Sequence, residues 1–164
     1  MKKFLVIILI VMSGCKHVTK VNGGHVQKRY TEFSIELPNE NWLAQPYDGT
    51  DLFFEHKHKP ASIFVSSQCE KISDSPLVAL SAQLLVGFSD IQIVSQKNIS
   101  LNEREALISE VLAKLDGVAR YLKIMVFKKN RCVYDIVLNQ KAFDEETNED
   151  FDKLIQSFTA RADL

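Results

Sequence analysis

The dipeptide Asp116-Gly117 stands between two long apolar runs, residues 104–115 and 118–129. Asp-Gly in this position favours a two-residue type I′ turn, because the twist of that turn matches the twist of the strands it joins. One side of the first run is apolar and consists of Leu107, Val111, Ala113 and Leu115. A polar turn at residues 128–131 precedes a third run, residues 132–139. The pattern therefore predicts three consecutive strands in an antiparallel meander.

Four further strands are predicted, at residues 30–37, 52–57, 61–68 and 91–99. The first alternates well, since Phe33, Ile35 and Leu37 lie on one side, which is typical of a half-buried strand. The second and third are separated by a short segment that includes Pro60, and we expect them to form a hairpin. The fourth is less regular, because Gln92, Ser95 and Gln96 interrupt its apolar residues.

Two segments have helical periodicity. Ser75 is predicted as the N-cap of the first helix, with Pro76 at its first position and Gly87 at its end. Thr147 and Asp150 resemble a capping box that opens the second. Their apolar faces consist of Leu77, Leu80, Leu84 and Leu85 in the first and Phe151, Leu154, Ile155 and Phe158 in the second. Two amphipathic helices and six or seven mostly antiparallel strands predict an α+β fold with the helices packed on the faces of the sheet.

Residues 1–14 have the pattern of a secretory signal peptide, with Lys2 and Lys3 before an apolar run and small residues at its end. The apolar run is far shorter than the roughly 20 residues that span a bilayer. Ser13-Gly14-Cys15 resembles the lipobox of bacterial lipoproteins, in which the cysteine is lipidated on sulfur, becomes the new N-terminus and is acylated. We therefore expect palmitate or a related acyl chain on Cys15. An ordinary signal peptide with a chance cysteine is the alternative.

The predicted organisation has three parts: a signal peptide (1–14), a lipidated cysteine with a flexible tether (15–29) and one globular domain (30–164). The tether is polar, contains Gly23-Gly24 and has no periodicity. Lys16 follows Cys15 where an aspartate would favour retention in the inner membrane. Its presence predicts anchoring in the outer membrane, facing the periplasm.

The charge of the chain argues against nucleic acid as a partner. The 20 basic and 21 acidic residues give a net charge of -1. Loss of Lys2 and Lys3 with the signal peptide leaves 18 basic residues and a net charge of -3. A weakly acidic domain lacks the basic surface that binds phosphates.

The chain has three cysteines. If Cys15 carries lipid, Cys69 and Cys132 are left as a pair in an oxidising compartment, where such cysteines usually form a disulfide. Two buried free thiols are the alternative.

The order of these elements resembles the PsbP-like fold shared with the Mog-type Ran-binding proteins. The resemblance rests on FSIELPNENW at residues 33–42, the hairpin of 52–68, the helix after Ser75 and the long meander with its Asp-Gly turn, and it extends over residues 30–161. Members include photosystem accessory proteins, a small-GTPase-binding factor and bacterial lipoproteins. The resemblance implies an α/β/α sandwich with a non-enzymatic accessory task, and no motif of this chain carries over metal or GTPase binding.

The sequence has no pattern of a catalytic, cofactor or metal site. His56 and His58 lie on the same side of a predicted strand, but two imidazoles without further ligands do not make a metal site. Asp48 and Asp51 flank a Gly-Thr turn that does not match a calcium loop. We expect no enzyme activity, no cofactor and no metal.

Four aromatic residues are candidates for a binding surface: Trp42, Tyr47, Phe53 and Phe54. Phe53 and Phe54 point to opposite sides of a strand, so that one of them faces the core and the other a surface. Packing of all four in the core is the alternative. We expect an anchored accessory or adaptor domain that binds another envelope protein, and alternatively a binding module for a small hydrophobic ligand.

Overall fold

The computed structural model describes residues 19–22, 25–28, 33–69 and 74–160. The elements of this part, in chain order, are β1 (Thr19–Asn22), β2 (His25–Lys28), β3 (Phe33–Glu36), β4 (Trp42–Gln45), β5 (Leu52–His56), β6 (Ala61–Cys69), α1 (Leu77–Gln83), β7 (Ser89–Leu101), β8 (Arg104–Leu115), β9 (Val118–Lys129), β10 (Cys132–Gln140), α2 (Glu145–Ser157) and β11 (Thr159–Ala160). Neither described helix is long and apolar enough to cross a membrane. The signal segment and Cys15 lie outside the described ranges.

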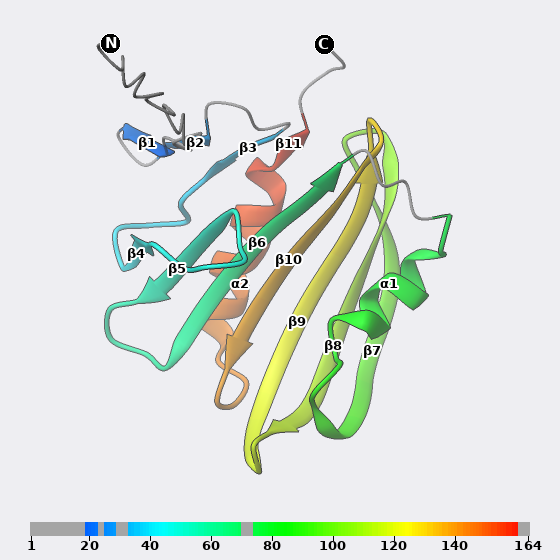
Figure 1. Cartoon of the computed structure of the whole chain (residues 1–164). Helices are drawn as coiled ribbons and strands as arrows, with labels where there is room; N and C mark the ends of the chain where they lie inside the picture. Colours follow the sequence, from blue (N-terminus) through cyan, green and yellow to red (C-terminus); the bar gives the residue numbers. More distant parts are fainter. Residues whose placement is uncertain (1–18, 23–24, 29–32, 70–73, 161–164) are drawn as a thin grey trace, which may run out of the picture.

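Seven strands form one antiparallel sheet in the order β4-β5-β6-β10-β9-β8-β7 (Figure 1). The predicted meander of β8, β9 and β10 is confirmed, and β7 adds a fourth strand in front of it. The predicted hairpin of β5 and β6 is also confirmed. Its second strand pairs with β10, so the hairpin extends the meander into a single sheet.

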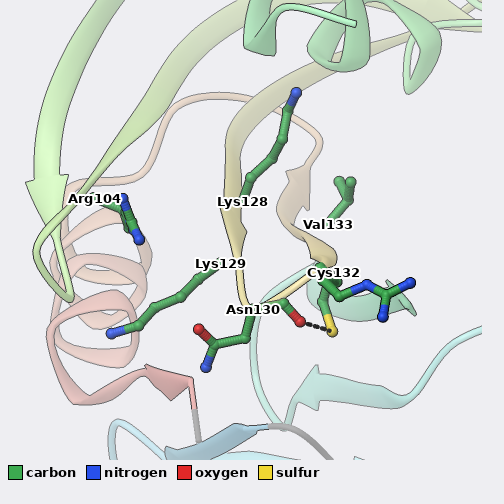
Figure 2. A pocket seen from close by; sticks show the side chains of 7 residues that line it. Arg104, Lys128, Lys129, Asn130, Cys132 and Val133 are labelled. Atoms are coloured by element: carbon green, nitrogen blue, oxygen red, sulfur yellow. Dashed lines mark hydrogen bonds between the residues drawn. The ribbon is translucent and has the colours of Figure 1, made fainter. Parts of the chain in front are cut away.

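Two-residue turns join the four strands of the meander. Asp116 and Gly117 have φ values of 51° and 78°, as the predicted type I′ turn requires. The same backbone conformation occurs at Asn102-Glu103 (50° and 63°) and at Asn130-Arg131 (53° and 61°). Asn130 is drawn at the turn between β9 and β10 in Figure 2. The three turns set the register of the four strands.

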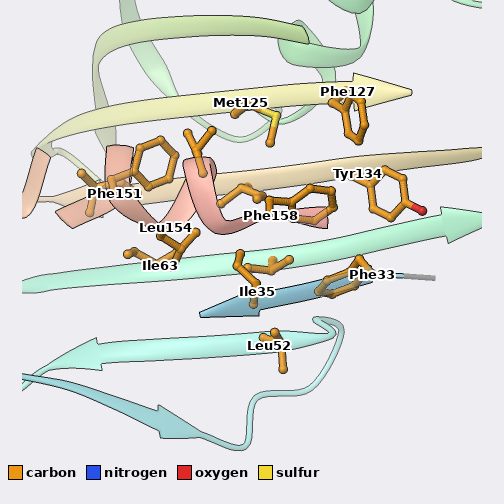
Figure 3. Close-up of a cluster of buried hydrophobic side chains, with 14 of the residues drawn as sticks. Phe33, Ile35, Leu52, Ile63, Met125, Phe127, Tyr134, Phe151, Leu154 and Phe158 are labelled. Carbon is orange, nitrogen blue, oxygen red and sulfur yellow. The ribbon is translucent and has the colours of Figure 1, made fainter. Parts of the chain in front are cut away.

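The main core fills the space between the inner face of the sheet and the layer made by α2 and β3 (Figure 3). Its largest fully buried side chains include Trp42, Phe33, Phe54, Phe127, Tyr134, Phe151 and Phe158. A second cluster lies on the outer face, where Leu80 and Leu85 pack on Val111, Leu122 and Ile124. The expected α+β architecture, with a helix on each face, is confirmed.

Helix α2 begins earlier than predicted. Its N-cap is Asp144, whose carboxylate accepts a hydrogen bond of 3.0 Å from the backbone N–H of Thr147. The expected capping box of Thr147 and Asp150 is therefore wrong, because Thr147 lies inside the first turn. Asp150 is buried, and its carboxylate accepts hydrogen bonds from the side chains of Trp42 and Asn39.

Helix α1 also differs at its start. Pro76 is the N-cap, and no side chain caps the helix. The helix ends at Gln83, four residues before Gly87, which has a φ of 94°. The expected N-cap Ser75 instead offers its carbonyl oxygen to Lys128 Nζ at 2.6 Å.

Strand β7 is longer than the predicted strand at residues 91–99, and most of its side chains are exposed. It pairs with β8 along nearly its whole length, with irregularities near Gln92 and Ser95. Ile91 and Ile93 are among the exposed residues. An edge strand is held by backbone hydrogen bonds with one neighbour, so its side chains need no apolar alternation.

Part of the expected flexible tether forms strands. Thr19–Asn22 and His25–Lys28 make a hairpin, and the second of these strands pairs with β3. Together with β11 they form a second, four-stranded sheet. The sequence lacked periodicity here because pairing with the edge of β3 uses backbone groups.

Cys69 and Cys132 form a disulfide, as expected for the two cysteines other than Cys15. They are directly opposite each other in the ladder of β6 and β10, with their Cα atoms 4.1 Å apart. The bond joins residues separated by 63 positions in the sequence.

Candidate functional site

Three aromatic rings gather on the outer face of the sheet, over β5 and β6. The ring centroids of Tyr47 and Phe53 are 4.9 Å apart, and those of Phe53 and Phe64 are also 4.9 Å apart. Tyr47 and Phe64 complete the triangle at 5.7 Å. The side chain of Tyr47 is 56% exposed. We call these three residues the outer aromatic patch.

Strand alternation places two of these rings. In β5 the side chains of Leu52 and Phe54 point into the main core, so Phe53 between them points outward. Phe64 lies directly opposite Phe53 in the register of β5 and β6. The two rings therefore form a cross-strand aromatic pair.

The loop between β4 and β5 brings Tyr47 over this pair. The loop returns to the sheet through Asp51, whose N–H donates to Val65 O at 2.9 Å. The Asp51 carboxylate accepts a hydrogen bond of 2.7 Å from Ser67 N. Gly49 has a φ of 85°, which favours glycine at the tip of the loop. Local turn chemistry thus holds an exposed tyrosine against two strand residues.

The structure divides the four residues of the expected binding surface. Tyr47 and Phe53 lie on the outer face, where their role in binding stays a prediction, but Trp42 is 2% exposed and Phe54 is 0% exposed, so these two belong to the core. Both point inward from their strands, as the alternation of β4 and β5 dictates. Phe64 was missed, although it stands between the inward residues Ile63 and Val65 and its outward direction follows from the same alternation.

A second group of polar residues lies beneath β4 and β5, against α2. The Asp150 carboxylate accepts a hydrogen bond from Trp42 Nε1 at 3.0 Å and another from Asn39 Nδ2 at 2.8 Å. The ring of His56 packs edge-on against Trp42, with the centroids 5.0 Å apart. Burial lowers the pKa of His56. These contacts fasten α2 to the edge of the sheet.

One combination of this group has the composition of a metal site. Single ligand atoms of His56, Glu146 and Asp150 lie within 4.8 Å of one another. However, His56 Nδ1 accepts hydrogen bonds from the backbone N–H groups of His58 (3.2 Å) and Lys59 (3.1 Å). The proton of the neutral imidazole is therefore on Nε2, which is buried without a hydrogen-bond partner among the described residues, and a protonated nitrogen does not bind a metal. The hydrogen bonds fit a packing role better than a metal site.

An ion-pair cluster lies next to this group, at the N-terminus of α2. Lys59 Nζ lies 2.7 Å from Asp144 Oδ1 and 2.6 Å from Glu146 Oε2. The hydrogen bond to Asp144 raises the pKa of Lys59, and the same bond lowers the pKa of Asp144. The turn between β5 and β6 is thus tied to the N-terminus of α2.

No protein-family model and no curated protein sequence matches the chain. Solved structures do resemble it. The Saccharomyces cerevisiae Ran-binding protein Mog1p matches with a TM-score of 0.60 at 8% identity, and the match covers 88% of this chain and 96% of that one. Cyanobacterial PsbP from Synechocystis matches with a TM-score of 0.57 at 12% identity, covering 79% and 86%. LpqN, which is involved in cell envelope biogenesis of Mycobacterium tuberculosis, matches with a TM-score of 0.52 at 17% identity, covering 77% and 83%. The chain therefore has the Mog1/PsbP-like fold.

Proposed function

We propose that the chain is a non-enzymatic accessory domain of a bacterial cell envelope, anchored through lipidated Cys15, and that it binds another envelope protein through the outer aromatic patch. The proposal depends on one observation: three contiguous aromatic rings lie on the outer face of the sheet over β5 and β6, whereas α1 packs on the outer face over β8 and β9. Its localisation in the outer membrane, facing the periplasm, follows from Lys16 after the cysteine and is part of the proposal.

A protein partner suits the shape and chemistry of this surface. The patch lies on the outer face of the sheet, where a second protein can bury its three rings together. Tyrosine is enriched among the residues that dominate interface energetics, because it buries a large ring and keeps a polar hydroxyl. Glu55 and Leu43 extend from neighbouring outward positions and give the patch a mixed rim.

The envelope location has two supports of different kinds. The first is the signal pattern with its lipobox-like cysteine, together with a disulfide that is stable in an oxidising compartment. The second is the fold, which this chain shares with a protein described as involved in cell envelope biogenesis.

The burial of His56, which lies close to the carboxylates of Glu146 and Asp150, supports a non-catalytic role. His56 is 5% exposed and is enclosed by Trp42 and the β5–β6 turn, so a substrate in solution has no direct approach to it. Two clefts near Arg104 and Lys128 are lined by arginine and lysine side chains together with Pro76, Leu77 and Val78, and such a mixed lining does not favour a small hydrophobic ligand over a protein partner.

Photocrosslinking in cells that export the full-length chain tests the proposal. Benzoylphenylalanine replaces Leu43, which is 43% exposed on β4 beside the patch, and the matched control replaces Phe143, which is 62% exposed before α2. We expect one discrete protein adduct from position 43 and none from position 143. Adding Tyr47→Ser should abolish the adduct without unfolding the domain. The absence of an adduct at position 43, or the same adducts at both positions, would contradict the proposal.

A further inference from the structure

Asp135 is a carboxylate on the outer face of the sheet, in the middle of β10. The strand alternates, so that Tyr134 and Ile136 point into the main core and Asp135 points outward. Asp135 is partly exposed, but its Oδ1 is buried and has no hydrogen-bond partner among the described residues. None of the ion pairs of this part of the chain includes it. Such a carboxylate costs stability, and carboxylates of this kind are common at functional sites.

The described residues around Asp135 do not neutralise it. Ser66 of β6 and Val126 of β9 lie directly opposite it in the two ladders. Helix α1, which packs on β8 and β9, contains no titratable residue. Among the described cations Lys128 is closest in the register, as a diagonal neighbour on β9, and its Nζ donates to Ser75 O at 2.6 Å. Burial alone raises the pKa of Asp135 to about 6, without a contribution from a neighbouring charge.

The Asp135 carboxylate lies beside the outer aromatic patch. In the ladder of β6 and β10, Phe64 is opposite Val137 and Ser66 is opposite Asp135, so Phe64 is a diagonal neighbour of Asp135. Figure 1 shows β6 and β10 side by side in the middle of the sheet. Diagonal neighbours on one face are about 7 to 8 Å apart, a distance that a long side chain bridges. Phe64, Val137 and Asp135 are all partly exposed, so the carboxylate and the patch belong to one surface.

Glu55 is a second carboxylate of this surface. It is opposite Ser62 in the ladder of β5 and β6, and it is thus a diagonal neighbour of Phe64 on the side away from Asp135. Its side chain is exposed, and no ion pair within the described ranges includes it. Two carboxylates therefore flank the ring of Phe64 along the direction of the strands.

Charged residues of both signs lie at the borders of this surface. Asp48 and Asp51 belong to the loop between β4 and β5, and the Asp51 carboxylate accepts a hydrogen bond from a backbone N–H of β6. Lys57 follows β5 and is exposed. In the register of the sheet, Lys57 lies beyond Glu55 and Lys128 lies beyond the position of Asp135. Both cations are thus outside the interval between the two carboxylates.

We propose that this surface receives a basic side chain of the envelope partner, an arginine or a lysine, which pairs with the Asp135 carboxylate and lies on the ring of Phe64. This inference rests on the proposed function and names the chemistry that the partner presents to the outer aromatic patch. A cation over an aromatic ring is attracted by the negative face of the ring, and more strongly where water is excluded. The same cation supplies a charge-assisted hydrogen bond to a carboxylate that has no donor among the described residues. Charge complementarity of this kind discriminates between partners.

Photocrosslinking from position 43 tests this inference in cells that export the full-length chain. Benzoylphenylalanine at position 43 is combined with Asp135→Asn, Asp135→Lys or Asp135→Glu, and the yield of the protein adduct is measured. We expect Asp135→Asn to lower the yield about tenfold or more, because a hydrogen bond between charged groups is lost. Asp135→Lys should abolish the adduct by repulsion, whereas Asp135→Glu should retain most of it. Glu149→Gln removes an exposed acid from α2 and should leave the yield unchanged.

Stability measurements separate a lost contact from a lost fold. The urea midpoint of Asp135→Asn at pH 7 should equal or exceed that of the parent, because the buried charge is gone. A reduced adduct together with a lower midpoint would give Asp135 a purely structural role and overturn the inference. An adduct that survives in Asp135→Asn but is lost in Asp135→Ala would point to a neutral hydrogen-bond donor, which overturns the basic side chain as well.

The pH dependence of the adduct is an independent readout, measured in isolated cell envelopes. A carboxyl group with a pKa of about 6 is about one-tenth ionised at pH 5, so the yield should fall about tenfold between pH 7.5 and pH 5. The direction follows from linkage, since a bound cation lowers the pKa of Asp135 and the complex is therefore favoured as the pH rises. The adduct of Asp135→Asn should lack this step. A step of the same size in Asp135→Asn would contradict the inference.

The outcomes also separate this inference from the proposed function. If the parent gives no adduct from position 43, the proposed function fails and the basic side chain loses its partner. If the parent gives one discrete adduct that persists in both Asp135→Asn and Asp135→Lys, the proposed function stands and the inference about the basic side chain is overturned.

Discussion

Trp42 Nε1 donates a hydrogen bond of 3.0 Å to Asp150 Oδ2, across 108 residues of sequence. The carboxylate is 1% exposed and also accepts a hydrogen bond from Asn39 Nδ2. One buried acid of α2 thus satisfies two donors, one from the loop between β3 and β4 and one from the first residue of β4. The helix is fixed on the sheet by directional polar contacts in addition to apolar packing.

Replacement of Asp150 by alanine is expected to lower the free energy of unfolding by about 2 to 4 kcal/mol, because the buried indole N–H of Trp42 and the half-buried amide of Asn39 lose their acceptor. Urea unfolding followed by tryptophan fluorescence measures the effect, since Trp42 is the single tryptophan of the chain. Glu149→Gln, at an exposed position of the same helix, should change stability by less than about 0.5 kcal/mol. Equal midpoints for the two variants would refute the structural role of Asp150.

The outer aromatic patch and the core should respond differently to truncation. Phe54→Ala removes a fully buried ring and is expected to cost about 3 to 5 kcal/mol. Tyr47→Ala removes a ring that is 56% exposed and should cost less than about 1 kcal/mol. Thermal or urea unfolding of both variants compares them directly. A large loss at Tyr47 would mean that this residue holds the fold together and is not reserved for a partner.

Asp135 makes stability depend on pH. Burial raises its pKa to about 6, and its Oδ1 has no hydrogen-bond partner among the described residues. The unfolded chain releases this proton near pH 4, so stability falls as the pH rises from about 4 to 6. Asp135→Asn should therefore stabilise the protein by about 2 kcal/mol at pH 7 and change it little below pH 4. Urea unfolding at both pH values gives the comparison, and an effect independent of pH would contradict the assignment.

Removal of the disulfide should destabilise the domain. Cys69→Ser with Cys132→Ser is expected to lower the free energy of unfolding by about 4 kcal/mol in the chain-entropy treatment of a loop of this length. A reductant should shift the urea midpoint of the natural chain and leave that of the double variant unchanged. If reductant has no effect on the natural chain, the two thiols are not joined in the mature protein.

The anchor is tested by labelled palmitate in cells that export the protein. The natural chain should incorporate the label and sediment with membranes, because the acyl chains partition into the bilayer. Cys15→Ala should lose both properties, whereas Cys69→Ser with Cys132→Ser should keep the label. Unchanged membrane association of Cys15→Ala would remove the basis of the proposed location.

Features encoded by neighbouring residues were predictable from the sequence. The turn at Asp116-Gly117 and the alternation around Phe53 and Phe54 depend on local backbone preferences, and both are confirmed. The caps of the helices were misplaced by one to three residues, because several serines, threonines and acids near a helix start have similar propensities. The choice among them depends on what each side chain meets in the folded chain.

The sequence by itself determined the two helices, β3, the strands from residue 52 to residue 140 and the faces that strand alternation assigns, whereas β1, β2, β4 and β11 were not predicted. Only the tertiary structure decided that β6 pairs with β10, that Trp42 donates a hydrogen bond to Asp150 and that β11 pairs with β3. These relationships join residues that are far apart in the chain, and no local propensity records them. They arise because the complete set of apolar faces and backbone groups has one arrangement that buries and pairs nearly all of them together.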